Sequence, residues 1–286
     1  MIDSEREVKR QVREFYDRVG WKEVSEGVFQ NARYEDLRPV SQEYIHRCHQ
    51  RVGRHLAPTG RLFLDAGSGP IQYPEYVEYS NGFTRRVCAD ISITALKAAR
   101  ERVGAKGAFV VSDISHLPFA PAAFDAVVSL HTIHHLPQNQ QVAAYDELYR
   151  VLANGRQAVV VNGWDNSRMM GFFNRVKYFI LRTRHNRSGR KRGVYTNTAA
   201  AASQEEVRGT FVDKHDPAWL KQALGGRFEF KIRVWRSAGT NFLRFFIREK
   251  WFGRFMLLLL FSLEELFPRY FGEVGRYPMI VITKAP

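Results

Sequence analysis

The chain has 286 residues, of which 45% are hydrophobic and 25% are charged, a composition that fits a folded globular protein and excludes a disordered or fibrous one. Its two cysteines, Cys48 and Cys88, are too few for a disulfide framework, and no signal-peptide core opens the sequence, so a cytoplasmic location is expected. The net charge of +14 comes from the second half, because residues 1–150 carry 19 basic and 19 acidic side chains whereas 151–286 carry 24 and 10.

Apolar residues at helical spacing open the chain over residues 4–19, and a second helix is expected from Ser41 to about Leu56. Short apolar runs then alternate with helical or turn-like stretches. Strands are expected at 62–64, 86–89, 108–111, 124–130 and 158–161. Strands that alternate with helices predict a parallel sheet covered by helices on both faces.

This alternation stops beyond Trp164. Residues 165–181 have a helical pattern, and residues 182–193 contain six Lys or Arg and no acid, which predicts a mobile loop. Asp216 and Pro217 are typical of a helix start, and that helix is expected to end near Leu224. Strands are expected at 228–235 and 277–283, with an apolar helical segment at 239–268 between them.

A glycine-rich turn follows the first expected strand, in the run Leu-Phe-Leu-Asp-Ala-Gly-Ser-Gly-Pro from Leu62 to Pro70. In a doubly wound sheet this turn lies at the carboxyl end of the strand, where ligands bind, and glycines let the backbone approach a ligand closely. Asp90 ends the next strand, 25 residues after Asp65, where an acidic residue is placed to hydrogen-bond a ribose. These two features alone suit a nicotinamide cofactor equally well.

Further motifs follow in order. They are Ala89-Asp90-Ile91-Ser92, Val110–Ile114 with Leu117-Pro118-Phe119, Phe124–Ser129, and Glu147–Leu152 before Asn154-Gly155. With the glycine-rich turn, this series resembles the class I S-adenosylmethionine-dependent methyltransferases over residues 62–163, most closely those that methylate small molecules such as quinones, sterols and sugars. The resemblance implies an α/β fold, a Rossmann-like three-layer sandwich with a seven-stranded, mostly parallel sheet, an antiparallel last strand and helical cap insertions.

The same resemblance implies S-adenosyl-L-methionine as cofactor and S-adenosyl-L-homocysteine as product. The cofactor-binding residues that it implies are Tyr16 in the closing helix, Asp65, Ala66, Gly67 and Gly69 around the methionine part, Asp90 and Ile91 at the ribose and adenine, Asp113 and Ile114 at the adenine amino group, and Ser129 and His131 beside the methyl donor. The chain departs from the family after Gly69, where Pro70-Ile71-Gln72-Tyr73 stands in place of a further glycine.

Three histidines, His131, His134 and His135, follow the fourth expected strand at the binding edge of the sheet. A hydroxyl acceptor benefits from a general base, and imidazole exchanges protons near neutral pH. We therefore predict His134 or His135 as the catalytic base and Asp165 as its orienting partner, with a merely packing or capping histidine as the alternative. No metal site is expected, because no clear acidic or cysteine ligand accompanies the cluster.

The sequence predicts four segments. Residues 1–60 are helices closing over the cofactor, 61–163 the cofactor-binding core, 164–215 a basic insertion, and 216–286 the remaining strands with an apolar helical cap inserted at 237–276. That insertion either covers the substrate pocket or lies on an anionic membrane, flanked by Arg244, Arg248, Lys250 and Arg254. Its apolar run is shorter than the roughly 20 residues that span a bilayer.

Both interpretations of the insertion suit a small-molecule or lipid-like acceptor, methylated at oxygen. An RNA methyltransferase that uses the basic second half is the alternative, and a non-catalytic S-adenosylmethionine-binding protein is a third possibility. Nucleic acid is the less expected partner, because no added RNA-binding module is evident. The sequence leaves the oligomeric state open.

Overall fold

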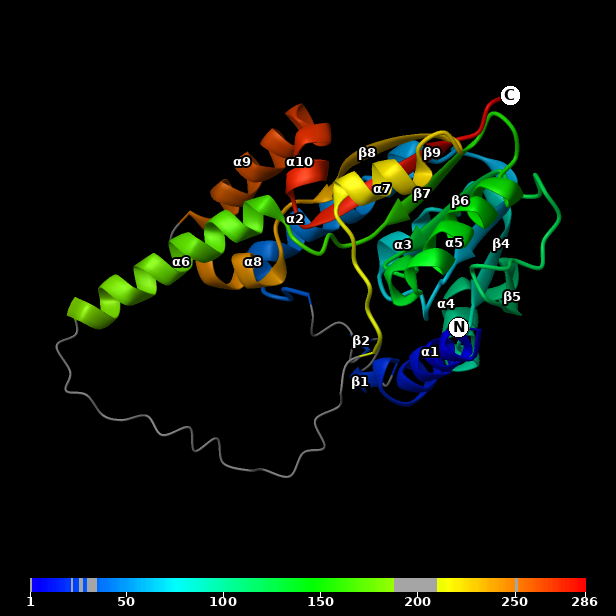
Figure 1. Cartoon of the computed structure of the whole chain (residues 1–286), viewed down its shortest axis with the longest axis horizontal. Helices are drawn as coiled ribbons and strands as arrows, with labels where there is room; N and C mark the ends of the chain where they lie inside the picture. Colours follow the sequence, from blue (N-terminus) through cyan, green and yellow to red (C-terminus); the bar gives the residue numbers. More distant parts are fainter. Residues whose placement is uncertain (1, 22, 26–27, 30–34, 188–209, 250–251) are drawn as a thin grey trace.

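The structure is a computed structural model that describes residues 2–21, 23–25, 28–29, 35–187, 210–249 and 252–286. A seven-stranded sheet in the order β5-β4-β3-β6-β7-β9-β8 forms its centre (Figure 1). Its strands are β3 (Gly60–Ala66), β4 (Phe83–Asp90), β5 (Gly107–Val111), β6 (Ala126–Leu130), β7 (Gln157–Val161), β8 (Glu229–Arg236) and β9 (Tyr277–Thr283). The first five are parallel, and β9 runs antiparallel to β7 and β8. The predicted sheet is therefore confirmed.

The central strands are buried on both faces. In β6, Val127 belongs to one apolar cluster whereas Ala126 and Val128 belong to the other, because successive side chains point to opposite faces. Helices α5 (Gln138–Val151) and α7 (Pro217–Leu224) pack in the first cluster, and α3 (Pro74–Glu78) and α4 (Ile93–Val103) pack in the second. This two-sided burial explains why these strands are continuous apolar runs in the sequence.

The strand order reverses at β3. From this strand the chain builds β4 and β5 to one side and then β6 and β7 to the other. Ligands bind in open α/β sheets at the carboxyl ends of the strands where the order reverses. The loops that follow β3 and β6 both lie at this crevice, and both contribute residues to a pocket there.

Polar residues fix the start of two helices. The Ser92 hydroxyl accepts from the Ala95 amide of α4 at 3.0 Å, and the Asp216 carboxylate accepts from the Trp219 amide of α7 at 2.8 Å. Each satisfies a backbone donor that has no partner within its own helix. The helix predicted to start at Asp216 and Pro217 and to end at Leu224 is confirmed.

An N-terminal helix, α1 (Ile2–Phe15), continues into a single π-helical turn (Tyr16–Gly20). A short hairpin of β1 (Glu23–Ser25) and β2 (Val28–Phe29), which was not predicted, precedes α2 (Pro39–Gln50) and a 3-10 turn (Val52–His55). Lys9 of α1 pairs with Asp113, and the Ser92 hydroxyl donates to Asp17. These contacts attach the N-terminal helices to the loops at the carboxyl ends of β4 and β5.

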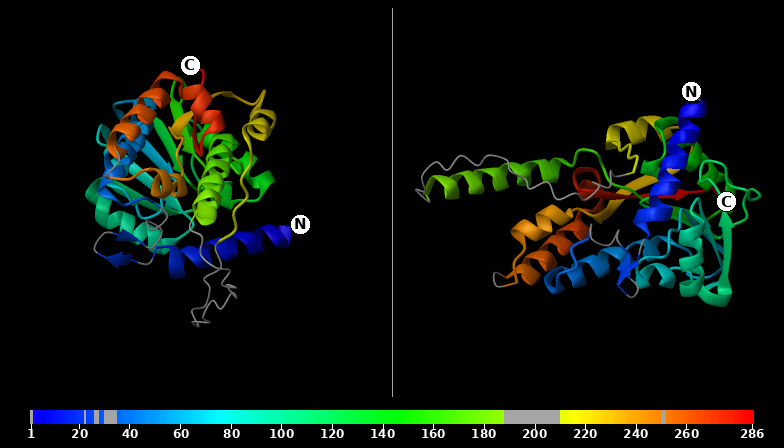
Figure 2. Two further views of the ribbon diagram at one scale, coloured as in Figure 1. Left: turned by 90° about the vertical axis from the view of Figure 1, so that its left-hand side faces the viewer. Right: turned by 90° about the horizontal axis from the view of Figure 1, so that it is seen from below.

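Four further helices are α6 (Arg168–Arg187), α8 (Thr240–Phe246), α9 (Gly253–Leu266) and α10 (Pro268–Val274). Figure 2 shows α6, α8 and α9 projecting to the same side, away from the sheet, and we call these three helices the extension. Leu243 of α8 and Phe261 of α9 share a third apolar cluster with Tyr44 of α2. The buried Arg51 guanidinium donates to Glu264 of α9 at 2.8 Å, which fixes α9 to the end of α2.

One prediction for this half is wrong and another is refined. Residues 182–187, predicted as part of a mobile loop, belong to α6, whereas 188–193 lie outside the described residues. The apolar segment at 239–268 divides into helices because Phe252 adopts a left-handed φ of 55° and Pro268 begins a new helix. Across the described ranges, no helix is long and apolar enough to cross a membrane.

Candidate functional site

The loop after β3 requires glycine. Gly67 and Gly69 have φ angles of 73° and 53°, in the left-handed region that glycine adopts without strain. A Cβ on Gly67 would lie 2.2 Å from Cγ2 of Thr132, which itself donates to the Gly67 carbonyl at 3.0 Å. The loops after β3 and β6 therefore pack directly against each other, with backbone of the first exposed to the crevice.

A buried ion pair supports this loop from below. Asp65, at the end of β3, pairs with Arg86 of β4, and both side chains are almost wholly buried. Burial raises the pKa of Asp65, while the Arg86 guanidinium opposes that rise. Arg86 also donates to the Tyr76 carbonyl, so the ion pair connects β3 and β4 to helix α3.

Asp90 terminates β4 beside the same loop. Its two carboxylate oxygens accept from the Gly69 and Ser92 amides, each at 2.8 Å. Burial raises the pKa of Asp90 to about 6, and these amide donors partly oppose the rise. The carboxylate is thereby held at the rim of the crevice, in contact with the glycine-rich loop.

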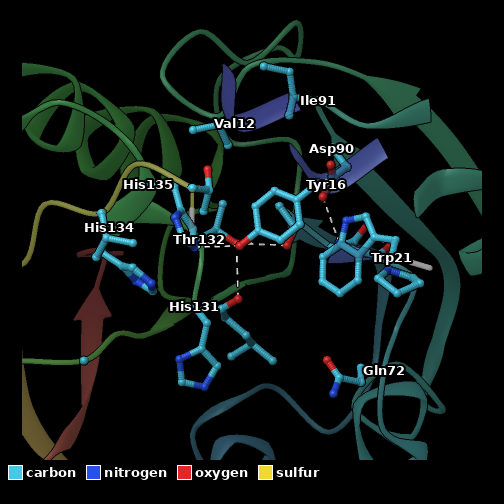
Figure 3. A pocket seen from close by; sticks show the side chains of 18 of the residues that line it. Val12, Tyr16, Trp21, Gln72, Asp90, Ile91, His131, Thr132, His134 and His135 are labelled. Atoms are coloured by element: carbon cyan, nitrogen blue, oxygen red, sulfur yellow. Dashed lines mark hydrogen bonds between the residues drawn. The ribbon is translucent and has the colours of Figure 1, made fainter. Parts of the chain in front are cut away.

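A pocket opens between these strand ends, the N-terminal helices and the segment before α7 (Figure 3). Nine of the predicted site residues line it: Tyr16, Asp65, Gly67, Gly69, Asp90, Ile91, His131, His134 and His135. Tyr16 lies at its centre, stacked on Trp21 with ring centroids 5.0 Å apart. Tyr277 also lines the pocket, so residues from both ends of the sequence meet at the edge of the sheet that was predicted to bind the cofactor.

Four other predicted cofactor residues lie outside the pocket lining. Ala66 and Ser129 are fully buried in the sheet, and Ile114 packs in the core. The Asp113 carboxylate is occupied by Lys9 and by the Ser115 amide at 2.9 Å. The cofactor roles expected for these four residues stay predictions.

His135 is held in one tautomer. Its Nδ1 lies 2.8 Å from the Phe211 carbonyl, and because a carbonyl only accepts, Nδ1 carries the proton. Its Nε2, 2.8 Å from the Tyr16 hydroxyl, is then an acceptor for that hydroxyl (Figure 3). Burial lowers the pKa of His135 to about 4, so the ring is neutral at pH 7. A neutral imidazole whose unprotonated Nε2 faces the pocket can take a proton, here through the Tyr16 hydroxyl that it already accepts from.

The other two histidines differ in their surroundings. His134 is buried, its Nδ1 is 3.3 Å from the Asn162 side-chain oxygen, and burial lowers its pKa well below the usual value. His131 has a left-handed φ of 57°, which is uncommon for a residue with a side chain. Its ring packs edge-on against Trp235 and Tyr277, and burial lowers its pKa to about 3.

The expected orienting role of Asp165 is corrected by the structure. Its carboxylate accepts from Asn166 at 2.7 Å on the surface, and Asp165 does not line the pocket. The Phe211 carbonyl orients His135 instead. The segment 210–214 was predicted only as part of a basic insertion, so its backbone role had no sequence signal.

Sequence reasoning also missed a buried ion pair in the pocket wall. Glu35 pairs with Arg236 and accepts from the Tyr73 hydroxyl at 3.1 Å. Although burial acts against it, the Arg236 guanidinium holds the pKa of Glu35 below its usual value. Lys214 lines the pocket nearby, and burial lowers its pKa. The pocket wall therefore carries a buried ion pair and a lysine in addition to the residues that the sequence predicted.

Comparison with known proteins agrees with the motif series. Residues 64–160 match the family described as methyltransferase domain. The chain is 26% identical over 165 residues to the methyltransferase GfsG of Streptomyces halstedii, covering 54% of this chain and 58% of that protein. It is 32% identical over 133 residues to the tRNA (carboxymethyluridine(34)-5-O)-methyltransferase alkbh8 of Xenopus tropicalis, covering 44% of this chain and 20% of that protein. The chain thus spans 58% or less of the length of these relatives.

Among solved structures, geranyl diphosphate C-methyltransferase from Streptomyces coelicolor A3(2) has a similar fold, with a TM-score of 0.53 and 14% identity over 97% of this chain and 98% of that chain. The fold extends well beyond the matched domain, to the N-terminal helices and the last two strands. Residues 64–160 therefore match a methyltransferase domain, and the chain as a whole has a fold similar to that of this methyltransferase.

Proposed function

We propose that this protein transfers a methyl group from S-adenosylmethionine to a hydroxyl of a small-molecule or lipid-like acceptor. The observation that carries the proposal is the fixed tautomer of His135. Its unprotonated Nε2 faces the same pocket as the glycine-rich loop. A proton acceptor of this kind assists an oxygen nucleophile, whereas methyl transfer to an uncharged amine has less need of one.

The residues around the glycine-rich loop fit the cofactor. Gly67 and Gly69 expose backbone that a side chain would cover, and Asp90 offers a carboxylate beside them for the ribose hydroxyls. Ile91 supplies an apolar contact on the same side of the pocket. The cofactor supplies an electrophilic methyl group on a positively charged sulfur.

The histidine side of the pocket fits the acceptor. The acceptor oxygen would bond to the methyl carbon as the bond from that carbon to the sulfur breaks and S-adenosylhomocysteine leaves. The acceptor proton would pass to Nε2 of His135, directly or through the Tyr16 hydroxyl that lies 2.8 Å away. Alignment of the reacting atoms and exclusion of water supply most of the rate enhancement for such an in-line displacement. Tyr16 and Trp21 cover this part of the pocket and exclude water from it.

A transfer RNA acceptor is the second candidate. Its support is the similarity of the core to the transfer RNA methyltransferase alkbh8, together with the basic second half of this chain. The two candidates differ in the molecule that carries the methyl group after reaction, so one experiment separates them.

The test is incubation of the purified protein with cell extract and S-adenosylmethionine labelled in its methyl group, followed by separation of lipid, small-molecule, RNA and protein fractions. We expect label in the lipid or small-molecule fraction, and a loss of rate by a factor of about 100 or more in His135→Ala. His55→Ala is the matched control, since that ring lies before β3, at the opposite end of the strand from the pocket. Label in RNA would favour the second candidate, and undiminished turnover of His135→Ala would refute the base.

A further inference from the structure

One face of α6 is exposed to solvent although it is rich in large apolar side chains. Phe172, Tyr178 and Phe179 are 61%, 68% and 66% exposed, and Leu181 is 45% exposed. Arg175 and Arg182 are exposed between them. Because 3.6 residues complete a turn, Phe172, Arg175, Phe179 and Arg182 follow one another along a single stripe of the helix. We call these six residues the α6 face.

The opposite side of α6 packs on α8. Phe173 contacts the ring of Phe242 in α8 with centroids 4.6 Å apart, and the Lys177 ammonium lies 4.9 Å from the ring of Phe245. Since this inner side fixes α6 to α8, the α6 face is held pointing away from the protein. The apolar exposure is thus a property of a fixed helix with a packed inner side.

The charge of α6 has one sign. The helix contains six Lys or Arg and no acidic residue, so no carboxylate within it neutralises these cations. It also lies in the half of the chain that carries 24 basic and 10 acidic residues. Exposed apolar area and an excess of positive charge both favour binding of a helix to the interface of an anionic bilayer, because apolar side chains leave water there and arginines attract the lipid phosphates.

We propose that the α6 face docks this protein on an anionic lipid surface. Phe172 and Phe179 enter the boundary between headgroups and acyl chains, while Arg175 and Arg182 pair with lipid phosphates. The extension offers further apolar area on α9, where Phe255 and Leu259 are 63% and 52% exposed. The inference does not depend on the methyl acceptor, because docking and catalysis involve separate residues.

A lipid surface fits these observations better than RNA does. Proteins that stack nucleotide bases on aromatic rings hold the strand in a basic groove. The α6 face is instead the convex outer side of a helix that projects from the body of the protein (Figure 2). Side chains such as Leu181 have no base or phosphate to recognise, whereas an acyl-chain boundary removes them from water.

Docking through α6 would bring the pocket edge of the sheet toward the lipid. Gly163 lines the pocket after β7, and α6 begins only five residues later at Arg168. Both therefore lie at the carboxyl ends of the parallel strands. If the acceptor is lipid-like, as proposed above, this placement shortens its path from the bilayer into the pocket.

The test is co-sedimentation of the full chain with phosphatidylcholine vesicles prepared with and without phosphatidylglycerol. We expect the protein to pellet only with the anionic vesicles. Arg175→Glu/Arg182→Glu and, separately, Phe172→Ser/Phe179→Ser should each reduce the partition coefficient about tenfold or more. Lys97→Glu/Arg100→Glu on α4 is the matched control, with the same change of charge at two exposed positions of the core, and should bind within about twofold of the wild type.

Each variant is first checked for binding of S-adenosylhomocysteine, so that a folding defect is not mistaken for lost docking. Failure of the wild type to pellet with anionic vesicles would overturn the proposal. An equal loss of vesicle binding in the α4 control would also overturn it. So would α6 variants that pellet like the wild type while transfer RNA displaces the wild type completely from the vesicles. Cofactor binding that survives while vesicle binding fails would leave the proposed methyl transfer intact.

Discussion

The core at residues 62–163 and the later segment at 164–276 use their side chains in opposite ways. In the core, the ends of β3, β4 and β6 bring Asp65, Asp90 and His131 to one pocket. Of the later segment, the described residues that line the pocket are Thr210, Val212, Lys214 and Arg236, and much of its apolar area faces solvent. The strand ends of the core line a pocket, whereas the later segment exposes many apolar side chains to solvent.

This difference corrects the expected position of the helical cap. None of the described residues of the 237–276 insertion lines the pocket, which is instead closed by the N-terminal helices and by residues 210–214. Within this insertion α9 packs on α2 and α10 packs on β8, and α8 and α9 project from the body of the protein. Changes in the extension should therefore leave cofactor binding intact, whereas changes in the core should not.

The largest effect is expected from Asp65→Ala. This change leaves the buried Arg86 guanidinium without its counter-charge, which should lower the free energy of unfolding by about 3–5 kcal/mol in urea denaturation. Binding of S-adenosylhomocysteine should be lost with it. Asp146→Ala removes a pair that is exposed on both sides and should cost about 1 kcal/mol or less. Equal losses in the two variants would contradict a buried pair at the centre of the core.

Glu264→Ala is the corresponding change in the extension. Glu264 accepts from Arg51, Tyr44 and Ser237, so its removal should also destabilise the fold. Arg51 keeps a second carboxylate in Glu265 at 2.8 Å, so we expect a loss near the lower end of the range, about 3 kcal/mol. Calorimetry should show an affinity for S-adenosylhomocysteine close to that of the wild type. Lost cofactor binding in the folded variant would mean that the two regions are not separable.

Two glycine substitutions give a smaller contrast. Gly67→Ala places a Cβ 2.2 Å from Thr132 on a backbone with φ of 73°, so we expect a loss of about 1–3 kcal/mol in thermal or urea unfolding. Gly171→Ala lies in α6 with nothing within 4 Å, and should raise stability by up to about 1 kcal/mol, because alanine favours the helix. The same sign in both variants would contradict the tight packing described for the first loop.

The smallest expected effect is a change in how stability depends on pH. His131, with its pKa lowered to about 3 by burial, stays neutral in the folded protein, whereas an unfolded histidine takes up a proton near 6.5. The unfolded state therefore binds more protons between these values, and stability falls as the pH is lowered from 7 to 5. His134 and His135 act in the same direction, whereas Asp90, with its pKa raised to about 6, acts in the opposite one.

Replacing His131 with asparagine should therefore make the melting temperature fall less steeply between pH 7 and 5. Asparagine tolerates the left-handed backbone at this position, so the substitution isolates the titrating ring. His116→Asn, on the exposed loop after β5, is the control. A slope unchanged from the wild type in His131→Asn would show that this ring is not held neutral by the fold.

The sequence predicted the strand ends well for a physical reason. Asp65 and Asp90 each follow a buried apolar strand, and parallel strands place their carboxyl ends at one edge, so local pattern and topology together locate both residues. The Glu35–Arg236 pair joins residues that are 201 positions apart, and neither has a local pattern that marks it. Lys9 and Asp113, 104 positions apart, are a second case of a contact that no local pattern marks.

Residues 182–187 show a different kind of error. Their charge predicted a loop, but arginine is a good helix former, and the helix that begins at Arg168 continues through them to Arg187. The pairing of His135 with the Phe211 carbonyl depends on backbone, which carries no residue-specific signal. Local pattern located Asp65, Asp90 and the histidines, whereas the groups that they contact required the tertiary structure.

The central claim, that the loop after β3 and the Asp90 carboxylate bind S-adenosylmethionine, is tested most directly by titration calorimetry with S-adenosylhomocysteine. The wild type should bind, and Asp90→Ala, which also frees the Gly69 and Ser92 amides, should bind on the order of tenfold to a hundredfold more weakly. Absence of binding by the wild type, or equal affinity in the two proteins, would contradict the account.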